Sequence, residues 1–217
     1  MTKTVYVLVE GPTEEQFVKE VLAPSFYSAN IFFKPIITTP KGAVKGRGTG
    51  GGIKWNTFKK ELFTIKGGIV TTFIDFYALD PGFPGFEPSP SPRKPITRVQ
   101  AIEAAMAQEL RDSRFIPYIQ LHEFEALCFA NGSGFQQFIE DKQAKDALCE
   151  IVRQFPNPED INEGPNTAPS KRILAQVPFY QKPLMGRKIT QAIGLPTLRA
   201  KCPHFNEWLT RIEAHPG

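Results

Sequence analysis

Apolar and β-branched residues gather in short runs in the first half of the chain, and these runs do not alternate with polar residues. The clearest runs cover residues 4–9 (TVYVLV), 31–37 (IFFKPII) and 68–74 (GIVTTFI). Continuous apolar runs of this length are typical of strands that are buried on both faces of a parallel sheet. A fourth run at residues 115–121 (FIPYIQL) predicts a further strand.

Helical patterns follow these strands. After the first strand we expect Thr13 to cap a helix, because a hydroxyl residue there precedes acidic residues and then apolar residues at helical spacing. Further helices are predicted at residues 56–65 and after Thr97, where a second hydroxyl residue precedes an apolar pattern. From residue 134 onward the chain is predicted to consist of helices and turns.

Two segments show no periodicity and are expected to be loops. Residues 40–54 are rich in Gly and Lys, and residues 79–95 are rich in Pro, Gly and Ser. Phe83 and Phe86 are expected to hold the second loop against the rest of the protein.

Strands that alternate with helices predict the α/β class, with a mostly parallel sheet flanked by helices. We expect an α/β core at residues 1–130 and a mainly helical C-terminal extension at residues 131–217 that packs on it. The 217 residues are 41% hydrophobic and 22% charged, which is ordinary for a globular protein.

The same composition argues against a membrane protein or a disulfide-rich one. The chain lacks an apolar run near the roughly 18 residues that a spanning helix needs. Three cysteines without CxxC spacing predict buried thiols rather than a disulfide framework or a zinc site. We therefore expect a cytoplasmic protein.

Acidic residues follow three of the predicted strands. Glu10 and Asp75 come directly after the first and third buried runs, and Glu123 follows residues 115–121. In open parallel sheets, ligands bind beyond the carboxyl ends of the strands, and carboxylates are preferred ligands of Mg²⁺ and Mn²⁺. The alternative is that these acids are solvated turn residues. Glu125 is two residues from Glu123, too close to share a helix face with it, so we expect only Glu123 to face the site.

Basic residues concentrate in residues 41–60, which contain six Lys or Arg and no acid, in a chain of net charge +4. Lys45, Arg47 and Lys54 are candidate contacts to nucleic-acid phosphates, and Trp55 is a candidate for stacking on bases. A solvated loop is the other interpretation. The run GRGTGGG lacks the Lys-Ser/Thr ending of a phosphate-binding P-loop.

A second basic pair, Lys171 and Arg172, follows a Pro-Ser that predicts a helix start. Cations at a helix N-terminus are electrostatically unusual, and they are reasonable where a phosphate binds. A solvated helix start is the alternative. Lys188 and Arg199 have weaker claims to such a role.

The segment VLVEGPTEEQF resembles the first motif of the Toprim superfamily, the catalytic fold of topoisomerases, bacterial primases and overcoming-lysogenization-defect nucleases. Asp75 in IVTTFIDFYAL matches the first acid of the superfamily's Asp-x-Asp strand, and Tyr77 stands where the second acid is expected. The segments YIQLHEFEALCF, INEGPNTAPSKRI and CPHFNEWL extend the resemblance to a Toprim-like bacterial family of unknown function, often encoded beside AAA or ABC-type ATPases.

This resemblance implies a Toprim-like Rossmannoid fold with Glu10 as the Toprim glutamate, Asp75 as the strand-end aspartate, Glu123 as a further acid and Lys171 as a phosphate contact. It implies a Mg²⁺- or Mn²⁺-dependent nuclease that acts on DNA or RNA, with an ATPase partner. The alternative is a non-catalytic module that docks on an ATPase, which Tyr77 favours. A third hypothesis is nucleotide binding through GRGTGGG.

Overall fold

The computed structural model describes residues 2–38, 53–77, 79–88, 91, 93–161 and 166–217. Its strands are β1 (Lys3–Val9), β2 (Ile31–Ile37), β3 (Ile69–Asp75), β4 (Phe115–Ile116) and β5 (Ile119–Gln120). The N-terminal helices are α1 (Pro12–Phe17), the π-helical turn η1 (Val18–Leu22), α2 (Ala23–Phe26), the 3₁₀ turn η2 (Tyr27–Ala29), α3 (Trp55–Thr64) and α4 (Pro95–Leu110). The later helices are η3 (Phe124–Phe129), α5 (Ser133–Phe138), α6 (Lys142–Gln154), η4 (Pro158–Asp160), α7 (Pro169–Gln176), η5 (Lys182–Gly186), α8 (Arg187–Ile193), α9 (Leu195–Lys201) and α10 (Pro203–Ala214).

The sheet is parallel, with strand order β2-β1-β3-β4 and with β5 also paired to β3. The predicted α/β class and parallel sheet are therefore confirmed. The single strand expected at residues 115–121 is instead divided into β4 and β5. Pro117 lies between them, and because proline has no N–H to donate to a sheet, the strand is interrupted there.

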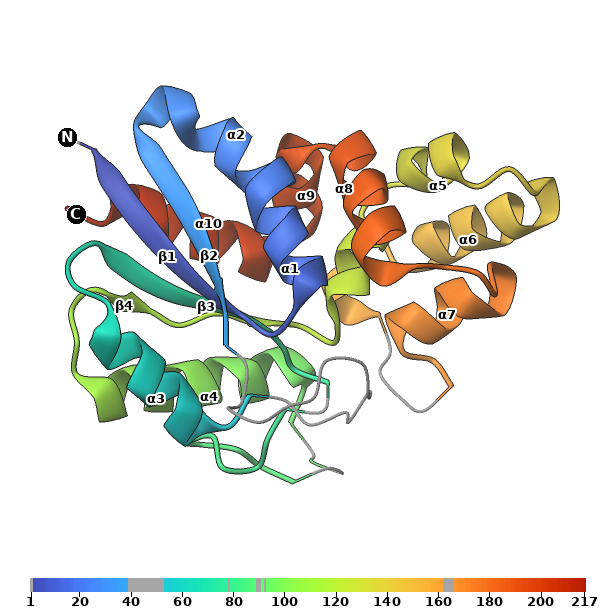
Figure 1. Cartoon of the computed structure of the whole chain (residues 1–217). Helices are drawn as coiled ribbons and strands as arrows, with labels where there is room; N and C mark the ends of the chain where they lie inside the picture. The colour runs from blue at the N-terminus through green and yellow to red at the C-terminus, as the bar shows by residue number, and fades with distance from the viewer. Residues whose placement is uncertain (1, 39–52, 78, 89–90, 92, 162–165) are drawn as a thin grey trace.

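Helices cover both faces of the sheet (Figure 1). Alternate residues of β1 point to opposite faces, so Val5 and Val7 pack with α1 and α10, and Leu8 packs with α3 and α4. Figure 1 shows α3 and α4 below the sheet, and the core contacts place α1 and α10 on its other face. Helices α5 to α8 extend sideways from the upper layer.

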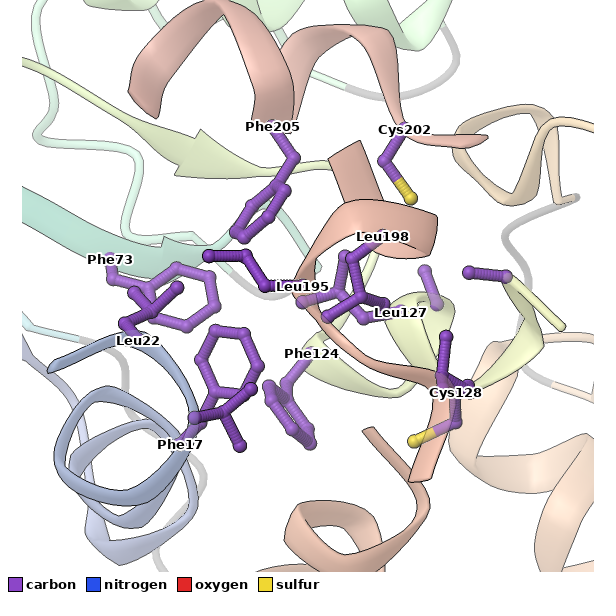
Figure 2. Close-up of a cluster of buried hydrophobic side chains, with 14 of the residues drawn as sticks. Phe17, Leu22, Phe73, Phe124, Leu127, Cys128, Leu195, Leu198, Cys202 and Phe205 are labelled. Carbon is purple, nitrogen blue, oxygen red and sulfur yellow. The ribbon is translucent and has the colours of Figure 1, made fainter. Parts of the chain in front are cut away.

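Residues after 131 share the main core with the strands rather than forming a core of their own. Phe17 of α1 contacts the rings of Phe124 and Phe205 at centroid distances of 5.3 Å and 6.1 Å. Figure 2 shows these rings beside Phe73 of β3, with Leu195 and Leu198 of α9 in the same cluster. The C-terminal helices thus supply part of the apolar cover of the sheet.

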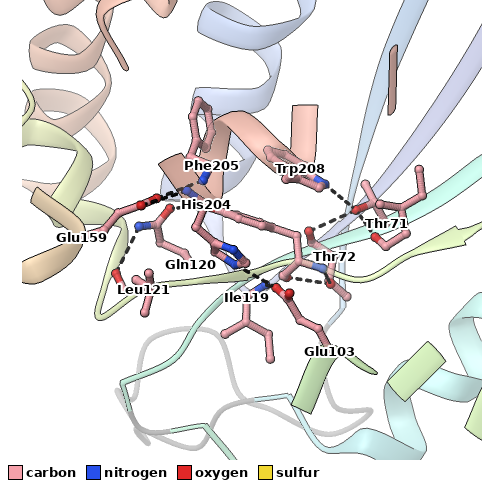
Figure 3. Close-up of polar contacts among 12 residues, drawn as sticks. Thr71, Thr72, Glu103, Ile119, Gln120, Leu121, Glu159, His204, Phe205 and Trp208 are labelled. Atoms are coloured by element: carbon pink, nitrogen blue, oxygen red, sulfur yellow. Dashed lines mark hydrogen bonds and ion pairs between the residues drawn. The ribbon is translucent and has the colours of Figure 1, made fainter. Parts of the chain in front are cut away.

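Buried hydrogen bonds fix helix α10 to the sheet (Figure 3). The Trp208 indole N–H donates to the Thr71 hydroxyl at 2.8 Å, and that hydroxyl donates to the Ile116 carbonyl. At the start of α10, the Glu159 carboxylate accepts hydrogen bonds from the backbone N–H groups of His204 and Phe205, both at 2.9 Å. A carboxylate in this position satisfies two N–H groups that the helix itself leaves unpaired.

Two helices begin earlier than predicted, with their N-caps displaced by two and by three residues. The first helix begins at Pro12 with Gly11 as its N-cap, and not at a Thr13 cap. Helix α4 begins at Pro95 with Lys94 as its N-cap, and not at Thr97. In both cases proline occupies the first helical turn, where its missing N–H costs nothing and its fixed φ favours the helix.

The loop at residues 79–95 is held as expected in its described part. Phe83 is 3% exposed and its ring lies 5.4 Å from that of Trp55, and Phe86 is half-buried against the same cluster. Within the described residues, no helix has both the length and the apolar character needed to cross a membrane.

The Trp208–Thr71 hydrogen bond gives a test of how firmly α10 is held. Replacing Thr71 by Val keeps the shape of the side chain but leaves the indole N–H and the Ile116 carbonyl without this partner. We expect the free energy of unfolding to fall by about 2 kcal/mol, as is usual for a buried polar group that loses its partner. Urea denaturation measures the change. The exposed Thr64→Val variant serves as control and should stay within about 0.5 kcal/mol of wild type.

Candidate functional site

Glu10 and Asp75 lie at the same edge of the sheet because β1 and β3 are adjacent and parallel. Val9 is in register with Phe73, so Glu10 leaves β1 near the point where Asp75 ends β3. On the other side of β3, Asp75 is in register with Gln120 of β5. The carboxyl ends of three neighbouring strands therefore meet here.

The Asp75 carboxylate is fixed by the start of η3. Its Oδ1 accepts a hydrogen bond from the backbone N–H of Phe124 at 2.8 Å. Burial raises the pKa of Asp75 well above its ordinary value, and the charges of Glu14, Glu10, Glu125 and Glu123 raise it further. Five carboxylates are thus close enough to repel one another, and we call Glu10, Glu14, Asp75, Glu123 and Glu125 the carboxylate cluster.

Burial also raises the pKa of Glu10, to about 7, although a backbone hydrogen bond from Asp75 and the charge of Lys182 act in the opposite direction. A carboxyl group that titrates near pH 7 is unusual, because its charged form is disfavoured until a cation or hydrogen-bond donor arrives. Perturbed pKa values of this kind are common at functional sites.

Glu14 belongs to the cluster although the sequence pattern did not single it out. Its Oε2 accepts a hydrogen bond from the Gly11 N–H at 3.0 Å, which closes the turn between β1 and α1. Burial raises the pKa of Glu14 to about 7, and the charges of Glu10 and Glu125 add to the effect. Its position three residues after the N-cap is the capping-box position, and this spacing was the available signal.

Glu123 connects the cluster to helix α7. Its Oε2 accepts from the Ser170 backbone N–H at 2.8 Å, and its Oε1 accepts from the Ser170 hydroxyl at 3.0 Å. The carboxylate therefore occupies the N-terminus of α7, the position for which the sequence left open either a bound phosphate or a solvated helix start. An anion is stabilised there by the unpaired N–H groups of the first turn.

Glu125 also faces the site, which differs from the expectation that only Glu123 would. The Lys182 ammonium lies 3.2 Å from Glu125 and 3.9 Å from Glu123. The helix-face rule did not apply, because Glu123 is in extended conformation and the 3₁₀ turn η3 begins only after it. Burial raises the pKa of Glu125, and Lys182 partly offsets the effect.

Lys182 is a basic residue of the site that was not predicted from the sequence. Burial works against its charge, but the carboxylates of Glu125, Glu123 and Asp75 together raise its pKa. It lies at the start of η5, a π-helical turn, and no motif or spacing marked it in the sequence.

The cluster is chemically suited to a divalent cation but is not arranged as a preformed site. Within the described parts of the chain, no three His, Cys, Asp or Glu side chains take up the geometry of a metal site. Glu14, Glu123 and Glu125 are engaged with Gly11, Ser170 and Lys182 respectively. One buried oxygen, Glu125 Oε1, accepts no hydrogen bond from the described residues, although the Lys182 ammonium is 3.2 Å away. Hard carboxylate oxygens in this number fit Mg²⁺ or Mn²⁺.

The basic residues predicted to contact nucleic-acid phosphates are not gathered in the carboxylate cluster. Lys171 is exposed and follows Ser170 directly, so its backbone lies beside Glu123. The Arg172 guanidinium donates to the Thr167 carbonyl at 2.8 Å and lies over the ring of Phe155. Lys54 is exposed as the N-cap of α3.

Lys45 and Arg47, with the whole GRGTGGG run, lie outside the described residues. Trp55 was expected to be available for base stacking, and this was wrong. The side chain is 5% exposed, stacks on Phe58, and donates its indole N–H to Glu109 at 2.9 Å.

The fold and the site together define an α/β protein with a carboxylate cluster at the carboxyl edge of a parallel sheet. The chain belongs to the family described as "Domain of unknown function (DUF4276)", whose model matches residues 9–213. A comparison with curated proteins finds no match.

Two solved structures resemble this chain at low sequence identity. The C-terminal region of the Burkholderia pseudomallei OLD protein is 15% identical with a TM-score of 0.45, covering 96% of this chain and 96% of that one. The C-terminal region of the Xanthomonas campestris pv. campestris OLD protein is also 15% identical with a TM-score of 0.45, covering 98% of this chain and 95% of that one.

The raised pKa of Glu10 predicts a specific pH dependence of stability. Because the folded-state pKa is about 7 and the ordinary value is 4.5, the folded protein binds the proton more tightly than the unfolded chain. The contribution of Glu10 to the free energy of unfolding is therefore fully present below pH 4.5 and is lost as the pH rises through about 7. In metal-free buffer, the melting temperature should fall between pH 5 and pH 8 in both proteins. The fall should be smaller in the Glu10→Gln variant than in wild type, by roughly 5 °C. Equal losses in the two proteins would show that Glu10 is not desolvated.

Proposed function

We propose that this protein is a Mg²⁺- or Mn²⁺-dependent nuclease of Toprim type that hydrolyses phosphodiester bonds in nucleic acid. The motif resemblance at VLVEGPTEEQF and IVTTFIDFYAL supports the Toprim assignment, and it names the two residues that the parallel strands bring to one edge, Glu10 and Asp75. The charge pattern of the site supports the metal.

The observation that carries the proposal is the gathering of four further carboxylates around Asp75, with fewer cations than carboxylates among the described residues. Four other carboxylates raise its pKa, and among the ion pairs of the described residues, those that reach the cluster come from Lys182 alone. Gathering buried carboxylates costs stability unless a cation accompanies them. A protein gains from such an arrangement when it binds a divalent cation.

Glu10 and Asp75 would hold the ion, and Glu123 or Glu125 would complete its ligands. A bound Mg²⁺ or Mn²⁺ supplies Lewis-acid polarisation of the scissile phosphate and lowers the pKa of water. Glu14, whose pKa is raised to about 7 and which is not among these ligands, is suited to accept the proton of an attacking water.

Positive charge for the nucleic-acid backbone would come from beside the cluster. Lys171 is exposed next to Ser170, which is hydrogen-bonded to Glu123, and this supports its role as a phosphate contact. Lys45, Arg47, Lys54 and Arg172 are proposed as further contacts to the phosphates. An AAA or ABC-type ATPase is the proposed partner, in a prokaryotic defence or DNA-maintenance system.

The metal site can be tested by calorimetric titration of Mn²⁺. Wild type should bind Mn²⁺, and the double variant Glu10→Gln with Asp75→Asn should not, because both changes remove a charged ligand and keep the side-chain shape. Glu140→Gln, at an exposed acid outside the cluster, serves as control and should bind like wild type. Binding that persists in the double variant would place the ion elsewhere and end the proposal.

Cleavage follows as a second test. Labelled single-stranded and double-stranded DNA and RNA are incubated with the protein and Mn²⁺, and products are separated by electrophoresis. Glu10→Gln and Asp75→Asn should each reduce the rate by at least about 100-fold, and chelation of the metal should abolish it. Glu140→Gln should cleave like wild type.

One observation favours a second candidate, a non-catalytic Toprim-like module that docks on an ATPase. Tyr77 stands where the resemblance expects a second acid, and its side chain is 41% exposed and cannot replace a carboxylate ligand. This candidate is distinguished by nucleic-acid binding without metal-dependent cleavage, and by nucleic-acid binding that is unchanged in the Glu10→Gln variant.

A further inference from the structure

The Lys182 ammonium is placed against the most deeply buried part of the carboxylate cluster. It donates a hydrogen bond to Glu125 Oε2 at 3.2 Å and lies 3.9 Å from Glu123 Oε1. The Glu125 side chain is 1% exposed, whereas the Lys182 side chain is 43% exposed. A partly exposed side chain therefore brings its ammonium to a carboxylate that is almost fully buried.

The backbone that carries Lys182 is firmly held although the side chain is half-exposed. η5 packs against α1 and runs directly into α8, where Arg187 forms an ion pair with Glu20 of η1. At the other end of the turn, a Cβ on Gly186 would lie 2.8 Å from the Tyr180 hydroxyl and 2.9 Å from the Phe124 ring. π-Helical turns such as η5 are frequent at functional sites. The backbone of Lys182 is thus held in place, and its ammonium is hydrogen-bonded to Glu125.

A buried carboxylate such as Glu125 needs a positive partner to remain charged. Lys182 provides a single positive charge at the oxygens of Glu125 and Glu123 that a divalent ion would also use. An ammonium and a divalent cation repel each other strongly at such short distance. The two cations are therefore alternatives at these oxygens.

We propose that Lys182 is a resident counter-cation of the carboxylate cluster, which competes with the divalent ion and thereby sets the metal affinity of the site. This inference rests on the proposed metal-dependent function. Lys182 keeps the cluster partly neutralised while no metal is bound, and it moves away from Glu125 when the divalent ion arrives. In this role Lys182 is a positioning residue that determines how readily the site is loaded.

Calorimetric titration of Mn²⁺ into Lys182→Met tests the competition. Methionine keeps the length of the side chain and removes its charge, so the Mn²⁺ dissociation constant should fall by about tenfold relative to wild type. Lys182→Arg keeps the charge and should bind Mn²⁺ like wild type. Lys188→Met is the matched control. Lys188 is exposed on the following helix, so this substitution removes the same charge at a position outside the cluster. It should also bind like wild type.

Thermal melting gives a readout that does not depend on activity. Without metal, Lys182→Met should melt at lower temperature than wild type, because Glu125 loses its positive partner. Added Mn²⁺ should raise the melting temperature of Lys182→Met by more than it raises that of wild type, because an ion that binds the folded variant more tightly stabilises its folded state more. Should Lys182→Met not fold, Lys182→Gln is measured in the same way, with the same expectations.

The outcomes separate this inference from the proposed function. If wild type binds Mn²⁺ and the neutral variants bind it with the same or lower affinity, the role of Lys182 is overturned and the metal site stands. Tighter binding in both Lys182→Met and Lys182→Arg would also overturn it, because shape and not charge would then be responsible. An absence of Mn²⁺ binding in wild type and in all Lys182 variants would overturn the proposed function together with the inference.

Discussion

The parallel pairing of β1 with β3 fixes where the charges of this protein meet. Parallel strands end at the same edge of a sheet, so the residues that follow them are brought together whatever their separation in sequence. Here Glu10 and Asp75 are the residues concerned. Their burial beside Glu14, Glu123 and Glu125 creates repulsion that raises the pKa of Asp75 well above its ordinary value. Most other features of the site can be understood as ways of holding or offsetting that charge.

The C-terminal third of the chain does much of this. It contributes Phe205 and Trp208 to the cover of the sheet, Ser170 to the Glu123 carboxylate, and Lys182 to Glu125. One hydrophobic cluster includes residues from β1, α1 and α10, and η5, which carries Lys182, packs against α1, so the packing that covers the sheet also positions the ammonium. The site is therefore a joint product of the strands and of the helices that follow them.

The sequence predicted those parts of the structure that depend on local pattern. The runs at residues 4–9, 31–37 and 68–74 correspond to β1, β2 and β3, and acids directly after such runs could be assigned to one edge. Residues placed by tertiary contacts could not be predicted in this way. Lys182 reaches the cluster through a π-helical turn that has no sequence pattern, and Glu125 does so because η3 is a 3₁₀ turn, to which α-helical spacing does not apply. The prediction that Trp55 is available for stacking on bases was wrong, because the burial of a side chain depends on the surface it packs against, here Phe58 and Phe83.

The two tryptophans of the chain lie on opposite faces of the sheet. Trp208 stacks on Tyr118 in the layer that contains α1 and α10, and Trp55 stacks on Phe58 in the layer that contains α3 and α4. Each layer thus carries one of the two tryptophans. Replacing one tryptophan at a time by phenylalanine leaves an emission signal from one layer alone, so loosening of the helices on either face can be followed separately in the intact protein.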